Sequence, residues 1–163
     1  MAEYSFVTVW KLEASIEKVW DAIYYFENWP QWWEYVESVT ETKEADDLRV
    51  GSIRHYTWKT VLGCKLLFDV ETVRVEPPFL LEGRARGELN GTGIWELSED
   101  KPITTVQYDW KVSTDKIWMN FLTPIARPFF KWNHDQVMKK GGEGLVNLLS
   151  LVNLLNCELI NSY

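Results

Sequence analysis

The stretch FKWNHDQVMKKGGEGLVNLL, residues 130–149, decides the fold of this chain. Its apolar side chains recur at three- and four-residue steps, which is the period of one face of an α-helix. That face comprises Phe130, His134, Val137, Met138, Gly141, Leu145, Leu148, Leu149 and, further on, Val152. The solvent side comprises Lys131, Asp135, Lys139, Glu143, Asn147 and Ser150. A helix with so long an apolar face needs a wide partner surface, so the stretch predicts a C-terminal helix packed against a sheet.

Prolines and glycines disturb the regularity of this helix. Pro124 and Pro128 lack an N–H and clash with the preceding turn, so we expect them to interrupt or kink the path after a short helix over 116–123 capped by Asp115. A glycine in a helix costs roughly 1 kcal/mol against alanine, and three occur at 141, 142 and 144. Either the helix bends there, or these glycines keep side chains out of a cavity or let a strand approach closely.

The remainder of the chain supplies the sheet. Residues 4–12 alternate as a strand, Ser15 caps a helix that runs to about Phe26, and residues 31–35 form a second, short helix. Six strands follow with short turns between them, over residues 36–43, 52–62, 65–75, 79–86, 92–97 and 104–113. Successive strands with short connections form an antiparallel meander. We therefore predict one α+β domain over residues 1–163, in the order β-α-α-β6-α.

Composition narrows the classes of partner. The net charge of −7 and the pI of about 4.9 argue against binding to nucleic acid or to an anionic membrane surface. Ten Trp, seven Tyr and seven Phe favour a ligand pocket, because Trp and Tyr combine a large apolar ring with a polar group. Two distant cysteines and no secretory signal predict a cytoplasmic protein without a disulfide framework. No run of about twenty apolar residues is present, so we expect no membrane span.

Three motifs make the chain resemble a known superfamily. They are GELNGTGIWEL at 87–97, TVQYDW at 105–110, and WNHDQVM at 132–138 followed by GGEGL at 141–145. They are similar to bacterial proteins of the START-like (SRPBCC) superfamily labelled polyketide cyclase/dehydrase, a superfamily that includes the birch pollen allergen. The resemblance covers nearly the whole chain. It implies the helix-grip fold, in which a curved antiparallel sheet wraps around the last helix and encloses a deep pocket for a hydrophobic small molecule. We expect no cofactor.

Aromatic residues on neighbouring strands are the candidate walls of that pocket. Trp95, Tyr108 and Trp110 share one inward parity. On the strand over 52–62, either His55 and Thr57 face the pocket or Arg54, Tyr56 and Trp58 do, and apolar content favours the second set. The predicted ligand-binding residues are Trp33, Tyr56, Trp58, Phe68, Trp95, Tyr108, Trp110, His134 and Met138.

Residues suited to catalysis are few. The chain has no phosphate loop, no GxSxG and no HExxH, and its two histidines fall short of the usual three protein ligands, so we expect no metal site. His134 is either a core histidine satisfied by one hydrogen bond or a pocket residue that orients a ligand carbonyl or acts as acid or base. We expect its neighbour Asn133 to bond backbone near the helix kink. An inward Arg54 would need a carboxylate or a ligand oxygen.

Two further arginines leave their orientation open. If Arg84 and Arg86 face outward, Gly83, Ala85 and Gly87 face inward and leave empty space; if they face inward, they can hold a carboxylate or polarise a carbonyl. The catalytic candidates are therefore His134, Arg84 and Arg54. Polyketide aromatase/cyclases of this superfamily are thought to use a buried arginine with pocket hydroxyls, but no particular arginine of this chain is matched to that role.

Three functions remain open. A binding protein for a lipid, quinone, isoprenoid or polyketide-like molecule requires few convergent acid or base groups, and we favour it. A cyclase/dehydratase requires a polar cluster at one point in the pocket. An interaction module would use exposed tryptophans in the segment 29–33 as a docking surface or pocket lid.

Overall fold

The computed structural model describes the backbone of residues 2–114 and 123–160 and the side chains of residues 3–114 and 126–151. The elements follow the predicted order: β1 (Ala2–Leu12), α1 (Ile16–Tyr24), the 3-10 helix η1 (Phe26–Asn28), α2 (Trp29–Trp32), β2 (Val36–Lys43), β3 (Ile53–Lys59), β4 (Lys65–Glu76), β5 (Leu80–Gly87), β6 (Asn90–Asp100), β7 (Ile103–Thr114) and α4 (Thr123–Ile160). The expected Asp115 cap and leading helix lie outside the described residues, as do the side chains of Val152 and Cys157.

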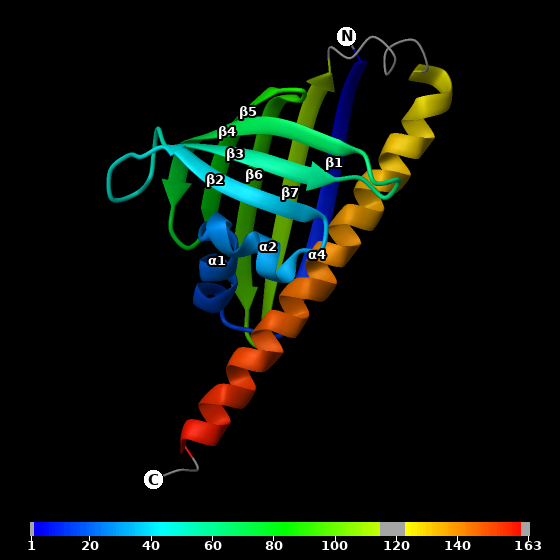
Figure 1. The fold of residues 1–163 in the computed structure, drawn as a ribbon. Helices are drawn as coiled ribbons and strands as arrows, with labels where there is room; N and C mark the ends of the chain where they lie inside the picture. Colours follow the sequence, from blue (N-terminus) through cyan, green and yellow to red (C-terminus); the bar gives the residue numbers. More distant parts are fainter. Residues whose placement is uncertain (1, 115–122, 161–163) are drawn as a thin grey trace.

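The seven strands form one curved antiparallel sheet in the order β1-β7-β6-β5-β4-β3-β2 (Figure 1). The meander from β2 to β7 is the predicted one, and β1 joins its end by pairing with β7. Side chains alternate between the two faces, as the period of a strand requires. On β7, for example, Val106 and Val112 are buried whereas Lys111 is exposed. The sheet therefore has one apolar inner face.

The long helix α4 crosses this sheet, with α1 and α2 beside it (Figure 1). Every described residue of the predicted apolar face, from Phe130 to Leu149, is buried or half-buried, and the six predicted solvent positions are exposed. At Pro128 the expected interruption does not occur, because α4 continues through this residue. The junction between the expected leading helix and α4 lies outside the described residues. Pro124 lies in the first turn, where a backbone N–H has no helical partner, so its missing donor costs nothing there.

The glycines of α4 allow helix α2 and two tryptophans to come close. A Cβ at Gly144 would overlap the Trp32 carbonyl oxygen, and a Cβ at Gly141 would overlap the Trp33 indole. At Gly142 a Cβ would lie 3.1 Å from Trp10 Nε1. We expected a strand to approach these glycines closely, but the element that does so is mainly the short helix α2. None of the three glycines lines the cavity described below.

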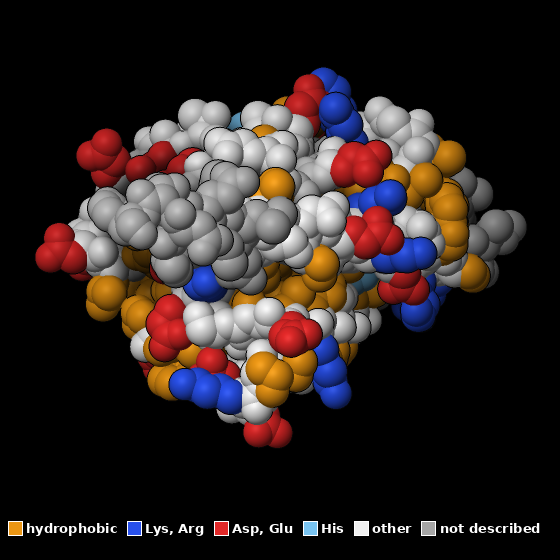
Figure 2. Space-filling model, turned by 90° about the horizontal axis from the view of Figure 1, so that it is seen from below, with side chains coloured by type: hydrophobic (Ala, Val, Ile, Leu, Met, Phe, Trp, Pro, Cys, Tyr) orange, Lys and Arg blue, Asp and Glu red, His pale blue; other side chains and the backbone are white. Residues whose placement is uncertain are grey.

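The surface carries both signs of charge. On the face shown in Figure 2, acidic and basic side chains are interspersed among hydrophobic ones. Lys131 and Asp135 form an ion pair of 2.6 Å on α4, and Lys140 lies 3.2 Å from Glu143. No helix in the described part of the chain is long and apolar enough to cross a bilayer.

Candidate functional site: an aromatic cavity between the sheet and α4

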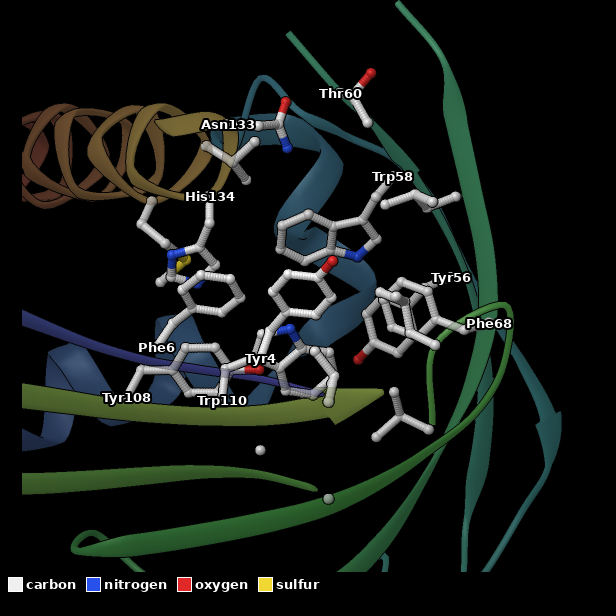
Figure 3. Close-up of a pocket in the computed structure, with 18 of the residues that line it drawn as sticks. Tyr4, Phe6, Tyr56, Trp58, Thr60, Phe68, Tyr108, Trp110, Asn133 and His134 are labelled. Carbon is white, nitrogen blue, oxygen red and sulfur yellow. The ribbon is translucent and has the colours of Figure 1, made fainter. Parts of the chain in front are cut away.

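A cavity of about 380 Å³ lies between the inner face of the sheet and α4 (Figure 3). Side chains from β1, from β3 to β7 and from the N-terminal half of α4 line it, and Phe26 and Trp29 add to the wall beside them. This volume is within the range of roughly 300–1,000 Å³ typical of small-molecule sites.

Eight of the nine residues predicted to bind ligand line this cavity: Tyr56, Trp58, Phe68, Trp95, Tyr108, Trp110, His134 and Met138. Trp33 does not. It is fully buried behind the wall, where its Nε1 donates a 2.8 Å hydrogen bond to the carbonyl oxygen of Val137 on α4. The sequence identified the tryptophan cluster after α1, but the residue of that cluster that reaches the cavity is Trp29.

The aromatic wall follows directly from the strand register. Trp95 on β6 pairs with Tyr108 on β7, and their ring centres are 4.0 Å apart in a stacked geometry. Tyr56 on β3 pairs with Phe68 on β4 in the same way, with 5.8 Å between ring centres. Directly opposite residues in an antiparallel pair project from the same face, which is why these rings meet. The wall is a rigid apolar surface suited to a flat or chain-like hydrophobic ligand.

Two lining residues on β1 were not singled out from the sequence. Tyr4 and Phe6 stack with 6.1 Å between ring centres, and Phe6 in turn stacks on His134 at 4.1 Å. Their alternation with exposed neighbours was visible in the sequence. The pairing of Phe6 with Trp110 across β1 and β7, which places them beside the cavity, was not.

The favoured inward set on β3 is confirmed. Arg54 and Tyr56 are buried, and His55 points outward to Asp69 at 2.7 Å. Arg54 Nη1 donates a 3.0 Å hydrogen bond to Thr72 Oγ1, and its guanidinium carbon lies 4.5 Å from the Phe26 ring centre. Burial lowers the pKa of Arg54. The carboxylate that an inward Arg54 was expected to need is that of Glu41, whose oxygen lies 3.4 Å from Nη2. The Thr72 hydroxyl and the Phe26 ring face are further partners.

The structure does not bring Arg84, one of the three catalytic candidates, to the cavity. It is exposed on the outer face of β5 together with Arg86, and it does not line the cavity. The inner face of β5 instead carries Gly83, which lines the cavity, and Ala85. Of the two orientations left open, the outward one therefore holds, and these small inner residues leave room for the cavity. Gly87, expected on the same inner face, is exposed.

His134 is a pocket histidine. Neither ring nitrogen has a hydrogen-bond partner among the described residues, and Nδ1 lies 3.8 Å from the nearest Asp135 oxygen. The hydrogen bond to a strand or a neighbouring loop that a core histidine would make is therefore absent among the described residues. Burial lowers the pKa of His134 to about 4, so the ring is neutral at pH 7.

Unpaired polar atoms gather around the cavity. In the described part of the chain, eight residues bury a side-chain nitrogen or oxygen without a hydrogen-bond partner: Tyr4, Trp32, Glu37, Ser52, Arg54, Trp58, Thr60 and His134. Five of these eight line the cavity, namely Tyr4, Arg54, Trp58, Thr60 and His134. Buried polar groups are normally paired, so such a concentration needs an explanation, and a bound ligand is one.

The cavity opens beside the hairpin between β3 and β4. All four exposed lining residues, Lys59, Leu62, Cys64 and Lys65, lie there. Asn133 holds this hairpin to α4, because its Oδ1 accepts a 2.8 Å hydrogen bond from the Val61 N–H. Asn133 therefore forms a hydrogen bond with the backbone, as expected, but its partner is in the hairpin and not in the helix.

The tryptophans of the segment 29–33 do not form an exposed surface. Trp29, Trp32 and Trp33 are all buried. The interpretation as an interaction module or an exposed aromatic lid is therefore wrong, since these rings form the core between α2, the sheet and α4.

Comparison with solved structures places this fold among known ones. A START superfamily protein from Mycobacterium smegmatis has a TM-score of 0.75 at 14% identity, over 91% of this chain and 98% of that one. The Zhui aromatase/cyclase from Streptomyces sp. R1128 has a TM-score of 0.75 at 12% identity, over 91% and 94%. The di-domain ARO/CYC BexL has a TM-score of 0.72 at 15% identity over 90% of this chain, which spans about half of BexL. At these identities the likeness shows the helix-grip fold alone.

Comparison of sequences gives the family. A search of curated proteins found no match to this chain. The family described as polyketide cyclase/dehydrase and lipid transport matches residues 4–148. That range includes β1 from Tyr4 onward, the strands β2 to β7 and the part of α4 that lines the cavity. The chain therefore belongs to the polyketide cyclase/dehydrase and lipid transport family.

Proposed function

We propose that the protein binds a hydrophobic small molecule, of the lipid, quinone, isoprenoid or polyketide-like kind, in the cavity between the sheet and α4. The observation that carries this proposal is the cavity itself: about 380 Å³ enclosed mainly by aromatic and aliphatic side chains. Burial of apolar surface is the main source of affinity for such a ligand.

A cavity-filling substitution tests this proposal. Val70 on β4 lines the cavity, and Val70→Phe places a ring in the space that a ligand would use. Val7→Phe is the matched control, because Val7 is an exposed valine on β1 outside the cavity lining. The probe is N-phenyl-1-naphthylamine, an uncharged dye that fluoresces in apolar surroundings.

We expect wild type and Val7→Phe to bind the dye equally and Val70→Phe to bind it at least tenfold more weakly. Urea unfolding of each variant checks that the fold persists. If both variants bind like wild type, the dye does not enter the cavity and the proposal fails. Native mass spectrometry of protein purified from its own host then identifies the class of any bound passenger.

A second candidate function is a cyclase/dehydratase that uses the same cavity. It is favoured by Arg54, a buried cation that lines the cavity on the same strand as the buried Tyr56 and whose Nη2 lies 3.4 Å from a Glu41 carboxylate oxygen. Such an arginine is suited to polarising a carbonyl of a poly-β-keto chain. The test is turnover of a poly-β-keto thioester, followed by mass spectrometry, for wild type and Arg54→Gln. Conversion by wild type that Arg54→Gln abolishes supports the enzyme, whereas an unaltered substrate excludes this reaction.

A further inference from the structure

Hydrogen-bond donors converge on one end of the cavity from three elements. Tyr4 on β1 contributes a hydroxyl and Trp58 on β3 an indole N–H, both buried and without a partner among the described residues. Asn133 on α4 contributes its NH2 group, because its oxygen is already occupied by Val61. Figure 3 shows the Tyr4 hydroxyl directed toward the Trp58 indole, with the Asn133 nitrogen turned to the cavity interior. We call Tyr4, Trp58 and Asn133 the donor cluster.

The donor cluster offers donors in excess of acceptors. An indole N–H and an amide NH2 can only donate, and a phenol donates one hydrogen bond. A purely hydrocarbon ligand would leave these donors buried and unpaired. A carbonyl oxygen has two lone pairs and can accept from two of them at once.

The surroundings of the donor cluster favour an uncharged ligand oxygen. His134 is neutral at pH 7, and Asp135 beside it is exposed and paired with Lys131 at 2.6 Å. Arg127, whose charge acts on the Tyr4 hydroxyl, is exposed and lies outside the cavity lining. The cavity's buried cation, Arg54, lies four residues from Trp58 along β3, which is about 13 Å of strand. At the opening, Lys65 is paired with Glu37 at 2.7 Å, and Lys59 lies 3.9 Å from the same carboxylate.

We propose that the donor cluster holds an uncharged carbonyl oxygen of the ligand, a ketone, quinone or ester, while the aromatic wall holds the apolar body. This inference rests on the proposed binding function and narrows its ligand class. It orients the molecule with its carbonyl at the hairpin end and its hydrocarbon against Tyr108 and Phe68. A site built to bond a substrate oxygen discriminates strongly against the analogue that lacks it, so the inference makes a sharp prediction.

The test uses two probes of nearly the same shape, 2-acetylnaphthalene and 2-ethylnaphthalene, which differ by the carbonyl. Their dissociation constants are measured by equilibrium dialysis with wild type, Tyr4→Phe, Trp58→Phe and the double variant. We expect wild type to bind the ketone at least tenfold more tightly than the hydrocarbon. Each single variant reduces this preference, and the double variant brings it within twofold while still binding 2-ethylnaphthalene.

Phe68→Leu is the matched control, since it removes apolar contact without a donor. This variant is expected to lower the affinity for both probes by the same factor. Infrared spectroscopy of the bound ketone gives an independent readout: its carbonyl stretch shifts to lower frequency in wild type and returns toward the free value in the double variant.

The outcomes separate this inference from the proposed function. If wild type binds both probes equally, or the double variant keeps the full preference, the donor cluster does not hold the carbonyl, although the cavity still binds hydrophobic molecules. If neither probe nor the naphthylamine dye binds wild type, both the proposed function and this inference are overturned. If the double variant fails to fold, the single variants Tyr4→Phe and Trp58→Phe still test the cluster, and equal binding of both probes by wild type still overturns the inference.

Discussion

The two halves of α4 face the same sheet with the same apolar period, yet one half packs into a filled core and the other borders the cavity. From Gly141 to Leu149 the helix closes on α2 and the tryptophans, and Leu145 is fully buried. From Phe130 to Met138 it stands over the cavity. The glycines at the contact let the C-terminal half pack closely, whereas the inward residues of the N-terminal half face the cavity. The period of a helix therefore predicts which face is covered but not whether a core or a cavity lies beneath it.

The largest effect should come from deleting side chains in the packed half. Leu145→Ala should lower the free energy of unfolding by about 2–5 kcal/mol, because it opens a new void in a filled core. Met138→Ala, where an open cavity already adjoins the side chain, should cost about 2 kcal/mol or less, mainly the lost transfer free energy. Urea unfolding followed by tryptophan fluorescence measures both. Equal losses would contradict the contrast between the halves.

The next effect concerns the glycines of the packed half. Gly144→Ala should destabilise by about 3 kcal/mol, because the new Cβ overlaps the Trp32 carbonyl oxygen and forces α2 away from α4. Gly142→Ala is the matched control. Its Cβ meets only Trp10 Nε1 at 3.1 Å, and the gain in helix propensity of roughly 1 kcal/mol offsets the contact. Thermal and urea unfolding should show that Gly144→Ala is much less stable than Gly142→Ala. The reverse order of stabilities would contradict the close approach of α2 to α4.

The half of α4 that borders the cavity should make the folding stability depend on pH, through His134. The pKa of His134 falls from 6.5 to about 4 on folding, so the unfolded chain binds more protons between these values. Stability from this group is therefore complete above pH 6.5 and is lost as the pH falls toward 4, by up to about 3 kcal/mol. In His134→Gln this loss should disappear, which unfolding curves from pH 7 to pH 4 will check. A decline of the same size in both proteins would assign it to other groups.

The smallest effect compares a paired indole with an unpaired one. Trp33 Nε1 donates to the Val137 carbonyl at 2.8 Å, whereas Trp58 Nε1 has no partner among the described residues. Trp33→Phe loses a buried hydrogen bond in addition to ring volume, so it should cost about 1–2 kcal/mol more than Trp58→Phe. Chemical denaturation of the two variants measures this difference. If it vanishes, the indole of Trp58 is satisfied in solution and the donor cluster loses a member.

Much of the fold could be predicted because strand and helix periods are written in the sequence. The alternation that placed Tyr108 and Trp110 inward, and the choice of Tyr56 over His55, needed only the period of a strand and apolar content. The order of elements followed from turns and length, and the resemblance supplied the curvature of the sheet.

The errors lie where a partner distant in sequence decides the outcome. Trp33 directly follows the four-residue helix α2, and so short an element has too few turns for its period to separate the core side from the cavity side. The inward position of Arg54 was predicted, but its partner Thr72 depends on the pairing of β3 with β4. The glycines were recognised as unusual, yet their reason is a helix that approaches from more than a hundred residues away in the chain.

The bond between Asn133 Oδ1 and the Val61 N–H has a kinetic consequence. It closes the hairpin onto α4 beside the opening, where the exposed Leu62 follows Val61 in the chain. A hairpin that closes equally over the empty and the filled cavity slows ligand entry and ligand exit by the same factor. It therefore leaves the ratio of the two rates, and so the affinity, unchanged. For a ligand that passes this opening, the hairpin would act on the rates of entry and exit, whereas the aromatic wall and the donor cluster would act on the affinity.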